Sequence, residues 1–404
     1  MRPDLFTHVI AFDEALARTM AAARPIERIE RLAILDAIGR VAAADVHAAA
    51  DVPAFARSAM DGYALRSADV AGAGITAPVV LTCVDRIATG EVSRRPIQPG
   101  ECAEIGTGAP MPEGADAVVM VERTTRDGDR VSVGEATRAS QNVGRRGADI
   151  AAGQPAIRRG DLIGAARAGA LAAIGATAVD VFARPRVSMF STGNEVVAPG
   201  EPLPPGHVHD VNSITLHAIA SQHGGVPMRR DPVGDSIDAL TDALVEASTS
   251  SDIVVTSGGS SVGGRDLLID ALARCGSVVF HGMAVKPGKP TLFGHVGTTP
   301  LFGMPGNPTS CLSNAHILLV PFLRTVARLP LWQPVRRTLP LSRAIAALAD
   351  RHQFYTVRIV AGRAEPAFKS SGDITSMAAA DGYVEIPAGG KGFEEGERVT
   401  VVLF

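Results

Sequence analysis

The feature that most constrains the fold is a repeated alternation of strand-like and helix-like segments between residues 186 and 329. Short apolar runs rich in β-branched residues alternate with longer segments whose apolar residues recur every three or four positions. This alternation is typical of βαβ units, so it predicts an α/β domain built on a mostly parallel sheet. The expected strands are 187–190 and 253–256, and the expected helices are 213–223, 237–247 and 267–274.

The regions on either side have a different pattern. Residues 12–23, 31–41 and 163–174 carry apolar side chains at helical spacing, which predicts three amphipathic helices. Between them, residues 50–149 consist of short β-rich runs separated by Gly and Pro, which predicts an inserted β domain. After Trp332 the pattern turns again to short strands and indicates a small C-terminal β domain. The clearest expected strands are 79–84, 117–121, 130–133, 338–341, 355–360, 383–386 and 398–403.

Charge and hydropathy argue against two classes of partner. The formal net charge is -3 and no run of like charge exceeds three residues, so binding to nucleic acid or an anionic membrane has no electrostatic basis. No apolar stretch approaches the length of a membrane span, and the N-terminus lacks a signal-peptide core, so we expect a cytoplasmic location. The cysteines form no C-x-x-C pair and are expected to be reduced and buried. They are Cys83, Cys102, Cys275 and Cys311.

Three loops at the expected strand-to-helix junctions form a candidate binding site. Open parallel sheets bind ligands where strand carboxyl ends meet helix N-termini, and the loops are 191–195, 256–266 and 303–308. The second contains four glycines and three serines, which leave backbone N–H groups free to bind an anion. In the third, Asn307 is an expected helix N-cap before Pro308. Ordinary, well-capped turns remain the alternative for each loop.

Charged residues near these loops suit an anionic ligand. Lys286 and Lys289 lie in a loop stiffened by prolines and present two ammonium groups, as a site for phosphate or another oxyanion requires. A solvated turn is the alternative. Carboxylates follow or flank the expected strands at the same sheet edge, which suits magnesium, although helix capping also explains Asp235 and Asp266. These carboxylates are Glu195, Asp210, Asp235 and Asp266. The ten histidines, including His207 and His209, are expected to be structural or solvated.

Seven short motifs occur in a fixed order along the whole chain. They are SAMDGYA at 58–64, TGAP with PEGADAVV at 107–119, GADI at 147–150, STGNE at 191–195, TSGG at 256–259, KPGKP at 286–290 and PGNP at 305–308. In this order they resemble the molybdopterin molybdenumtransferases, the MoeA and gephyrin E-domain family. Each motif alone is weak, and their order is what carries the resemblance.

The resemblance implies a multidomain α/β plus β fold with four domains. These are a helical dimerisation domain (1–49 and 150–184), an inserted β domain (50–149), a MogA-like α/β molybdopterin-binding domain (185–330) and a C-terminal β barrel (331–404). It also implies an elongated homodimer whose cleft lies between the α/β domain of one subunit and the inserted domain of the other. Contacts with other enzymes of cofactor biosynthesis remain open.

The implied activity is that of a molybdotransferase, which inserts molybdate into adenylylated molybdopterin, releases AMP and leaves molybdenum bound by the dithiolene. Magnesium is the implied cofactor. The implied catalytic residues are Asp61, Thr107, Asp149, Glu195 and Asp266. The implied substrate-binding residues are Ser257, Gly258, Gly259, Lys286, Lys289, Pro305, Asn307, Arg351 and Ser371. The expected metal ligands are Glu195, Asp235 and Asp266.

The sequence departs from the family pattern at two points. Gly264-Arg265-Asp266 replaces the acidic residue that commonly follows Ser-Val-Gly, and Ser213 stands where arginine is frequent. Both departures concern the geometry of the metal and pterin contacts.

Two other functions are weighed against the transferase. A molybdopterin adenylyltransferase resembles only the α/β part, and the motifs at Asp61 and Thr107 argue against it. A noncatalytic dimeric scaffold that binds partner proteins would not require Lys286, Lys289 and the acidic residues.

Overall fold

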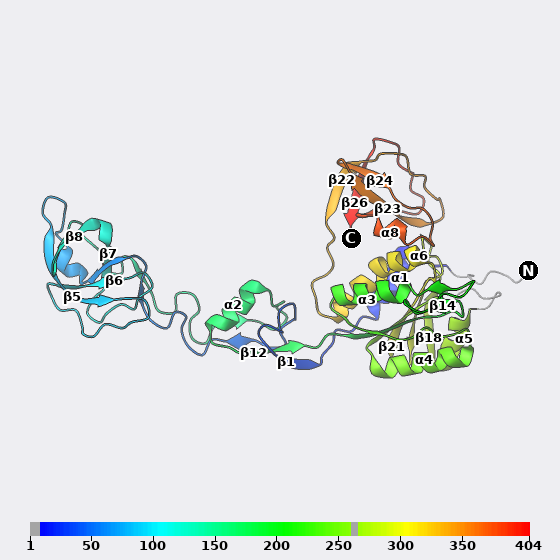
Figure 1. Cartoon of the computed structure of the whole chain (residues 1–404), viewed down its shortest axis with the longest axis horizontal. Coiled ribbons are helices and arrows are strands. Elements are labelled where there is room, and N and C mark those ends of the chain that lie inside the picture. Colours follow the sequence, from blue (N-terminus) through cyan, green and yellow to red (C-terminus); the bar gives the residue numbers. More distant parts are fainter. Residues whose placement is uncertain (1–8, 260–265) are drawn as a thin grey trace, which may run out of the picture. The chain divides into compact units, whose positions relative to one another are not determined.

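The chain folds into two compact units, shown in the computed structural model of Figure 1, which describes residues 9–259 and 266–404. Unit 1 comprises residues 9–29 and 182–404, and unit 2 comprises residues 30–181. Among the described residues, no helix has both the length and the apolar character that a membrane crossing requires.

The central sheet of unit 1 has six strands in the order β16-β13-β17-β21-β20-β18. The first four are parallel to one another, and β20 and β18 continue the sheet in antiparallel fashion. The sheet is therefore mixed, with the expected parallel strands forming one side. Its strands are β13 (Arg186–Ser191), β16 (Val226–Arg229), β17 (Ile253–Ser257), β18 (Gly276–His281), β20 (Leu292–Val296) and β21 (Thr299–Met304).

Helices follow the parallel strands as the sequence pattern predicts. They are α3 (Asn212–Gln222), α4 (Ile237–Ser250) and α5 (Leu267–Cys275). After β21 the expected long apolar helix is interrupted, because α6 (Pro308–Asn314) continues as a π-helical turn, η3 (Ala315–Leu319), before α7 (Val320–Val326). Phe190 is buried in a cluster with Leu240 and Leu244. Three other phenylalanines, Phe293, Phe302 and Phe322, form the centre of the larger core, with the ring centroids of Phe302 and Phe293 5.0 Å apart.

The first helix, α1 (Phe12–Ala21), packs on this core and not in a separate helical domain with residues 30–49. Its Ala15 and Thr19 are fully buried, and the Phe12 ring lies edge-on to Phe354 at 5.1 Å. The residue before it, Ala11, follows a bridge between Ile10 and Met283. The apolar stripe of this helix was visible in the sequence, but the stripe did not show which core it covers.

The C-terminal residues of unit 1 form a second six-stranded sheet in the order β19-β23-β25-β26-β22, with β24 paired to β23. Strand β19 comes from the lysine loop and runs parallel to β23, with Lys286 beside Gln353. Closure of this sheet into a barrel remains a prediction. Its elements are β19 (Val285–Lys286), β22 (Arg336–Pro340), β23 (His352–Val360), β24 (Arg363–Pro366), β25 (Gly382–Ile386), β26 (Arg398–Leu403) and the short helix α8 (Thr375–Ala378).

Unit 2 contains a six-stranded sheet in the order β7-β4-β6-β5-β9-β8, which includes the strands expected for the inserted β domain. Side chains such as Leu65, Leu81 and Val119 fill its core. Its elements are β4 (Gly62–Leu65), β5 (Val79–Ile87), β6 (Glu101–Ile105), β7 (Ala117–Met120), β8 (Thr124–Asp127), β9 (Arg130–Val133), η1 (Ser67–Val70) and η2 (Val121–Arg123).

Two-stranded sheets and one helix complete unit 2. The pairs are β2 (Val46–His47) with β11 (Pro155–Ile157), and β3 (Arg57–Ser58) with β10 (Val143–Gly144). The helix expected near 163–174 is present as α2 (Ala165–Ala173).

The prediction of a helix at 31–41 is wrong. This segment forms strand β1 (Ile29–Ala33), which pairs with β12 (Ala178–Phe182), followed by a turn. Leu32 and Ile34 pack on the core that contains Val179, so the apolar spacing is satisfied by a sheet partner far away in the sequence. Gly39 then adopts a φ of +79°, which stops a helix from continuing.

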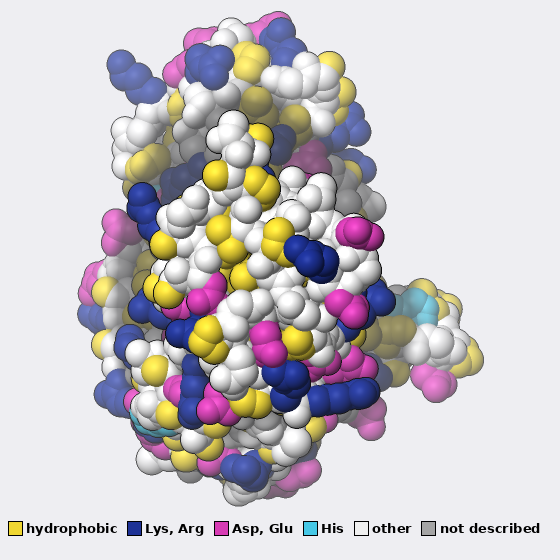
Figure 2. Space-filling model, turned by 90° about the vertical axis from the view of Figure 1, so that its left-hand side faces the viewer, with side chains coloured by type: hydrophobic (Ala, Val, Ile, Leu, Met, Phe, Trp, Pro, Cys, Tyr) yellow, Lys and Arg dark blue, Asp and Glu magenta, His cyan; other side chains and the backbone are white. Residues whose placement is uncertain are grey.

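The surface carries charges of both signs. On the face shown in Figure 2, Lys and Arg side chains alternate with Asp and Glu, and apolar side chains are scattered between them. No field of one sign extends over this face, so an anionic ligand would depend on a local group of donors.

Candidate functional site

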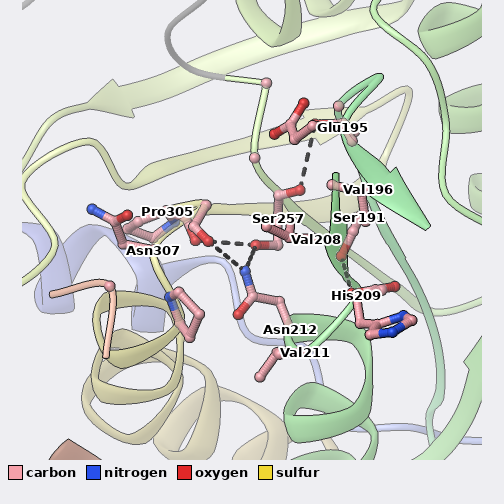
Figure 3. Close-up of a pocket in the computed structure, with 18 of the residues that line it drawn as sticks. Ser191, Glu195, Val196, Val208, His209, Val211, Asn212, Ser257, Pro305 and Asn307 are labelled. Carbon is pink, nitrogen blue, oxygen red and sulfur yellow. Dashed lines mark hydrogen bonds between the residues drawn. The ribbon is translucent and has the colours of Figure 1, made fainter. Parts of the chain in front are cut away.

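A cavity of about 760 Å³ lies in unit 1 at the carboxyl ends of β13, β17 and β21 (Figure 3). Its wall brings together the loops predicted from the sequence. The predicted site residues that line it are Glu195, Asp235, Ser257, Gly258, Gly259, Pro305 and Asn307. The edge of the sheet expected to hold a ligand therefore does form a cavity, of a size suited to small molecules.

Ser257 ties the loops under the cavity together (Figure 3). Its buried hydroxyl donates to the carbonyl of Pro305 at 3.0 Å and accepts from the Asn212 side-chain amide at 2.7 Å. The same amide donates to the carbonyl of Gly306 at 2.8 Å. The end of β17, the loop after β21 and the start of α3 are thereby held in one hydrogen-bonded group.

Gly258 is required for this arrangement. Its φ is +95°, and a Cβ added there would lie 2.4 Å from the carbonyl oxygen of Thr192. Any side chain would therefore push apart the two loops that follow β13 and β17. The close approach leaves backbone atoms, and not side chains, exposed to the cavity at this point.

Asn307 departs from its expected role as a side-chain cap. It occupies the N-cap position of α6, but its side chain makes no capping hydrogen bond and donates instead to the hydroxyl of Ser371 at 3.1 Å. Gly372 and Ile374, which follow Ser371, line the cavity. The structure thus brings together two predicted residues, and the C-terminal segment supplies part of the wall.

The cavity wall carries three carboxylates, those of Glu195, Asp210 and Asp235, of which Asp210 is buried. Asp235 does not cap α4, because Ser236 accepts the capping bond from the Ala239 amide. Asp235 instead exchanges hydrogen bonds with Asn194, at 3.3 Å and 3.0 Å, which fixes it beside the loop that carries Glu195. Magnesium is commonly held by one or two carboxylates together with substrate phosphate oxygens, so Glu195 and Asp235 fit such an ion.

Asp266 lies apart from that pair. It caps α5, with Oδ1 accepting from the amides of Leu268 and Ile269 at 3.1 Å and 3.3 Å, and Oδ2 lies 3.1 Å from Nε2 of His281. Its side chain is buried. Within residues 9–259 and 266–404, no group of three or more His, Cys, Asp or Glu is placed to hold a metal ion, so the expected three-carboxylate group does not form. Residues 260–265, with the Gly264-Arg265 departure, lie outside the described residues.

The lysine loop reaches the cavity through Pro290. The whole chain has four lysines, and two of them, Lys286 and Lys289, stand in this loop. In the described part of the chain, the cavity lining includes neither lysine nor Arg351. The Arg351 guanidinium pairs with Asp350 at 3.2 Å, just before β23 runs alongside β19.

In unit 2 the structure brings Asp61 and Thr107 together. Oδ1 of Asp61 accepts from the Thr107 amide at 2.7 Å and from its hydroxyl at 2.9 Å. These bonds, the amide first, lower the pKa of Asp61 because they stabilise the charged form. Asp149 lies on another exposed loop of the same unit, where its amide donates to the carbonyl of Val52 at 3.1 Å.

Sequence reasoning missed other cavity residues. His207 and His209 line the cavity because β15 (Val208–His209) pairs in parallel with β14 (Val196–Val197), next to Glu195. Their one-residue spacing was visible, but the pairing was not. Asn212 also lines the cavity, and no local pattern marks its role. Ser213, one of the two departures, donates its amide to Asp210 at 3.0 Å.

This architecture defines a multidomain α/β protein with a ligand cavity at the carboxyl edge of its sheet. Comparison with known proteins gives the family. Residues 10–175 match the MoeA N-terminal region (domain I and II), residues 188–325 match the probable molybdopterin binding domain, and residues 338–404 match the MoeA C-terminal region (domain IV).

Individual relatives agree over almost the whole length. The molybdopterin molybdenumtransferase of Bacillus subtilis is 31% identical, with 98% of this chain and 94% of that protein covered. Molybdopterin molybdenumtransferase 2 of Mycobacterium tuberculosis is 33% identical over 92% of this chain and 93% of its own length. The crystal structure of a MoeA protein from Pyrococcus horikoshii superimposes with a TM-score of 0.86 at 34% identity, covering 98% and 99% of the two chains. The chain belongs to the molybdopterin molybdenumtransferase (MoeA) family and is a transferase of molybdenum cofactor biosynthesis.

Proposed function

We propose that this transferase inserts molybdate into adenylylated molybdopterin and releases AMP. In this reaction water adds to a phosphorus of the phosphoanhydride and the bond to AMP breaks. The two dithiolene thiols then replace one oxygen of molybdate: two Mo–S bonds form, one Mo–O bond breaks, and that oxygen leaves as water with the two thiol protons. The observation that carries the proposal is the cavity at the sheet edge, whose wall combines glycine backbone, hydroxyl groups and three carboxylates. An anionic ligand with both a ring system and phosphates suits that combination.

The cavity wall suggests a division of roles. Ser257, Gly258 and Gly259 would hold the pterin and phosphate part through the backbone of their loop, and Pro305 and Asn307 would form the opposite side. Glu195 and Asp235 would hold Mg²⁺, which neutralises phosphate charge when it is bound. Asp266 would act by fixing the start of α5 at the end of the glycine-rich loop.

The remaining predicted residues complete the proposal. Lys286, Lys289, Arg351 and Ser371 would attract and orient molybdate, since cationic groups and hydroxyls suit an oxyanion. Asp61, Thr107 and Asp149 would take part in the chemistry through their exposed polar atoms.

We also propose a cytoplasmic homodimer. Leu35 and Ile38 in the turn after β1 are 80% and 48% exposed, and apolar side chains gathered in this way commonly mark a protein interface. Light scattering that gave the mass of one chain at micromolar concentration would contradict the dimer.

The test of the function is an insertion assay with purified protein, adenylylated molybdopterin and molybdate. Lys286→Ala and Lys289→Ala should each raise the KM for molybdate about tenfold, the effect of losing about 1.4 kcal/mol of binding. Their melting temperatures should stay close to that of the unchanged protein, because loop lysines supply charge and not core packing. Lys391→Ala, at an exposed C-terminal lysine, is the matched control and should be silent. Normal kinetics in both loop variants would remove the lysines from the site.

A further inference from the structure

The backbone of the lysine loop, residues 286–290, is held by one buried side chain. Asn314 is the last residue of α6 and is fully buried. Its Nδ2 donates to the carbonyl of Gly288 at 2.9 Å and to the hydroxyl of Thr291 at 2.5 Å. Thr291, also fully buried, donates its hydroxyl to the same Gly288 carbonyl at 2.9 Å.

These three hydrogen bonds form a closed group. A carboxamide has two N–H donors, and both donors of Asn314 are used on the loop. The Gly288 carbonyl accepts twice, which uses both of its lone pairs. Because the group is buried, water cannot replace a bond that is lost.

Gly288 and Asn314 also fit each other sterically. Gly288 has a φ of +105°, and a Cβ added there would lie 2.1 Å from Nδ2 of Asn314. The loop carbonyl can therefore approach the amide only because the loop residue is glycine. On its other side, the loop is held by the Met283 amide, which donates to the carbonyl of Lys289 at 2.9 Å.

Helix α6 connects this group to the cavity. Asn307 and Pro308 line the cavity at its first turn, and Asn314 lies at its last residue. The π-helical turn η3 begins directly after Asn314, and such turns often occur at functional positions in helices. One short helix thus fixes both the cavity wall and the loop that carries two of the four lysines.

We infer that Asn314 is a positioning residue for molybdate binding: it holds the Gly288 carbonyl and thereby sets where Lys286 and Lys289 present their charges. The inference rests on the proposed function of the lysine loop. It concerns a residue that lies outside the cavity and carries no charge, so its effect must pass through the loop.

The experiment measures KM for molybdate, kcat and melting temperature for Asn314→Ala. A loosened loop should raise the KM for molybdate about tenfold while kcat changes less than about twofold, because the loop binds the anion and Asn314 touches no reacting atom. Ser313→Ala is the matched control, since Ser313 is buried in the same helix, whereas the side chain that donates to the loop is that of Asn314. It should leave KM unchanged.

A second variant tests the same inference if Asn314→Ala does not fold. Thr291→Val preserves the shape of the side chain and removes the hydroxyl that bonds to Asn314 and Gly288. It should therefore raise the KM for molybdate about threefold. Unchanged KM in the folded variants, with an active parent protein, would overturn the inference alone. A parent protein that neither binds molybdate, as measured by calorimetry, nor inserts it would instead overturn the proposed function.

Discussion

The polar residues of the two units differ in burial and in the number of bonds they make. In unit 1, Ser257, Asp266 and Asn314 are all buried, and each makes at least two hydrogen bonds. The bonds of Ser257 and Asn314 join separate segments, whereas those of Asp266 cap α5. In unit 2, Asp61 and Thr107 are exposed and bond mainly to each other. Substitutions of these residues in unit 1 should therefore also change the stability of the fold, whereas substitutions of Asp61 and Thr107 in unit 2 should leave its stability nearly unchanged.

The most buried histidines lie in unit 1. Unit 2 has one histidine, the exposed His47, whereas the others in the described residues belong to unit 1. Burial, together with a smaller effect from nearby Arg324, lowers the pKa of His223 to about 4. Burial also lowers the pKa of His316 to about 4, with a smaller effect from His223. Acid should therefore act on the two units differently.

The largest expected effect is the loss of stability of unit 1 in mild acid. Both histidines are neutral in the folded chain, but in the unfolded chain each takes up a proton near pH 6.5. Their contribution is complete above pH 6.5 and is lost as the pH falls towards 4. For either histidine the pKa difference corresponds to about 3 kcal/mol of unfolding free energy, and the two contributions are coupled and do not simply add.

The measurement can use the single tryptophan. The ring of Trp332 lies 5.0 Å from that of His223, so its fluorescence reports on this cluster during denaturant unfolding at pH 7 and pH 4.5. Hydrogen exchange of peptides from residues 30–181 follows unit 2, which should change much less over this pH range. His223→Gln should flatten the pH dependence of unit 1. Equal losses of stability in both units between pH 7 and pH 4.5 would contradict the expected difference between them.

A smaller change in the free energy of unfolding is expected for substitutions of Asp266, which can affect both stability and activity. Asp266→Ala removes the cap of α5 and should cost about 1 kcal/mol or somewhat more, because the side chain is buried. Asp266→Asn keeps an acceptor oxygen for the amides of Leu268 and Ile269, so it should cost less.

Denaturant unfolding and the insertion assay together separate the two roles of Asp266. If its charge matters to the reaction, Asp266→Asn loses most activity at nearly full stability. If it serves only as a cap, activity follows stability in both variants. Full turnover by a stable Asp266→Asn protein would end the catalytic assignment.

How much of the structure could be predicted from the sequence depended on how far apart in the sequence the contacting residues are. The loops at 191–195 and 303–308 were found because strand, turn and helix signals are local. The strand at Ile29–Ala33 was taken for a helix because its partner, β12, is remote and the apolar spacing fits both structures. The same limit hid Asn212 and Asn314, whose roles consist of contacts with residues 94 and 26 positions away.

The carboxylates show a second limit, in which residue type alone does not decide between alternative roles. Asp235 and Asp266 each follow a strand and precede a helix, and both were weighed as caps or metal ligands. The structure separates them because Ser236 takes the cap of α4 and leaves Asp235 at the cavity, whereas Asp266 caps α5 itself.

The smallest expected effect on stability is at Asp61, and it tests unit 2 most directly. Asp61→Asn retains an oxygen that can accept from the amide and hydroxyl of Thr107, so the unfolding free energy should change by less than about 0.5 kcal/mol. The substitution removes the negative charge, which the lowered pKa of Asp61 maintains at neutral pH. If that charge orients or accepts a proton in the reaction, insertion should fall about a hundredfold. Asp69→Asn is the matched control, because Asp69 also accepts from a backbone amide, that of Gly100 at 2.9 Å, in the same unit. Equal activities of the Asp61 and Asp69 variants, with equal melting temperatures, would mean that the exposed pair in unit 2 only shapes a turn.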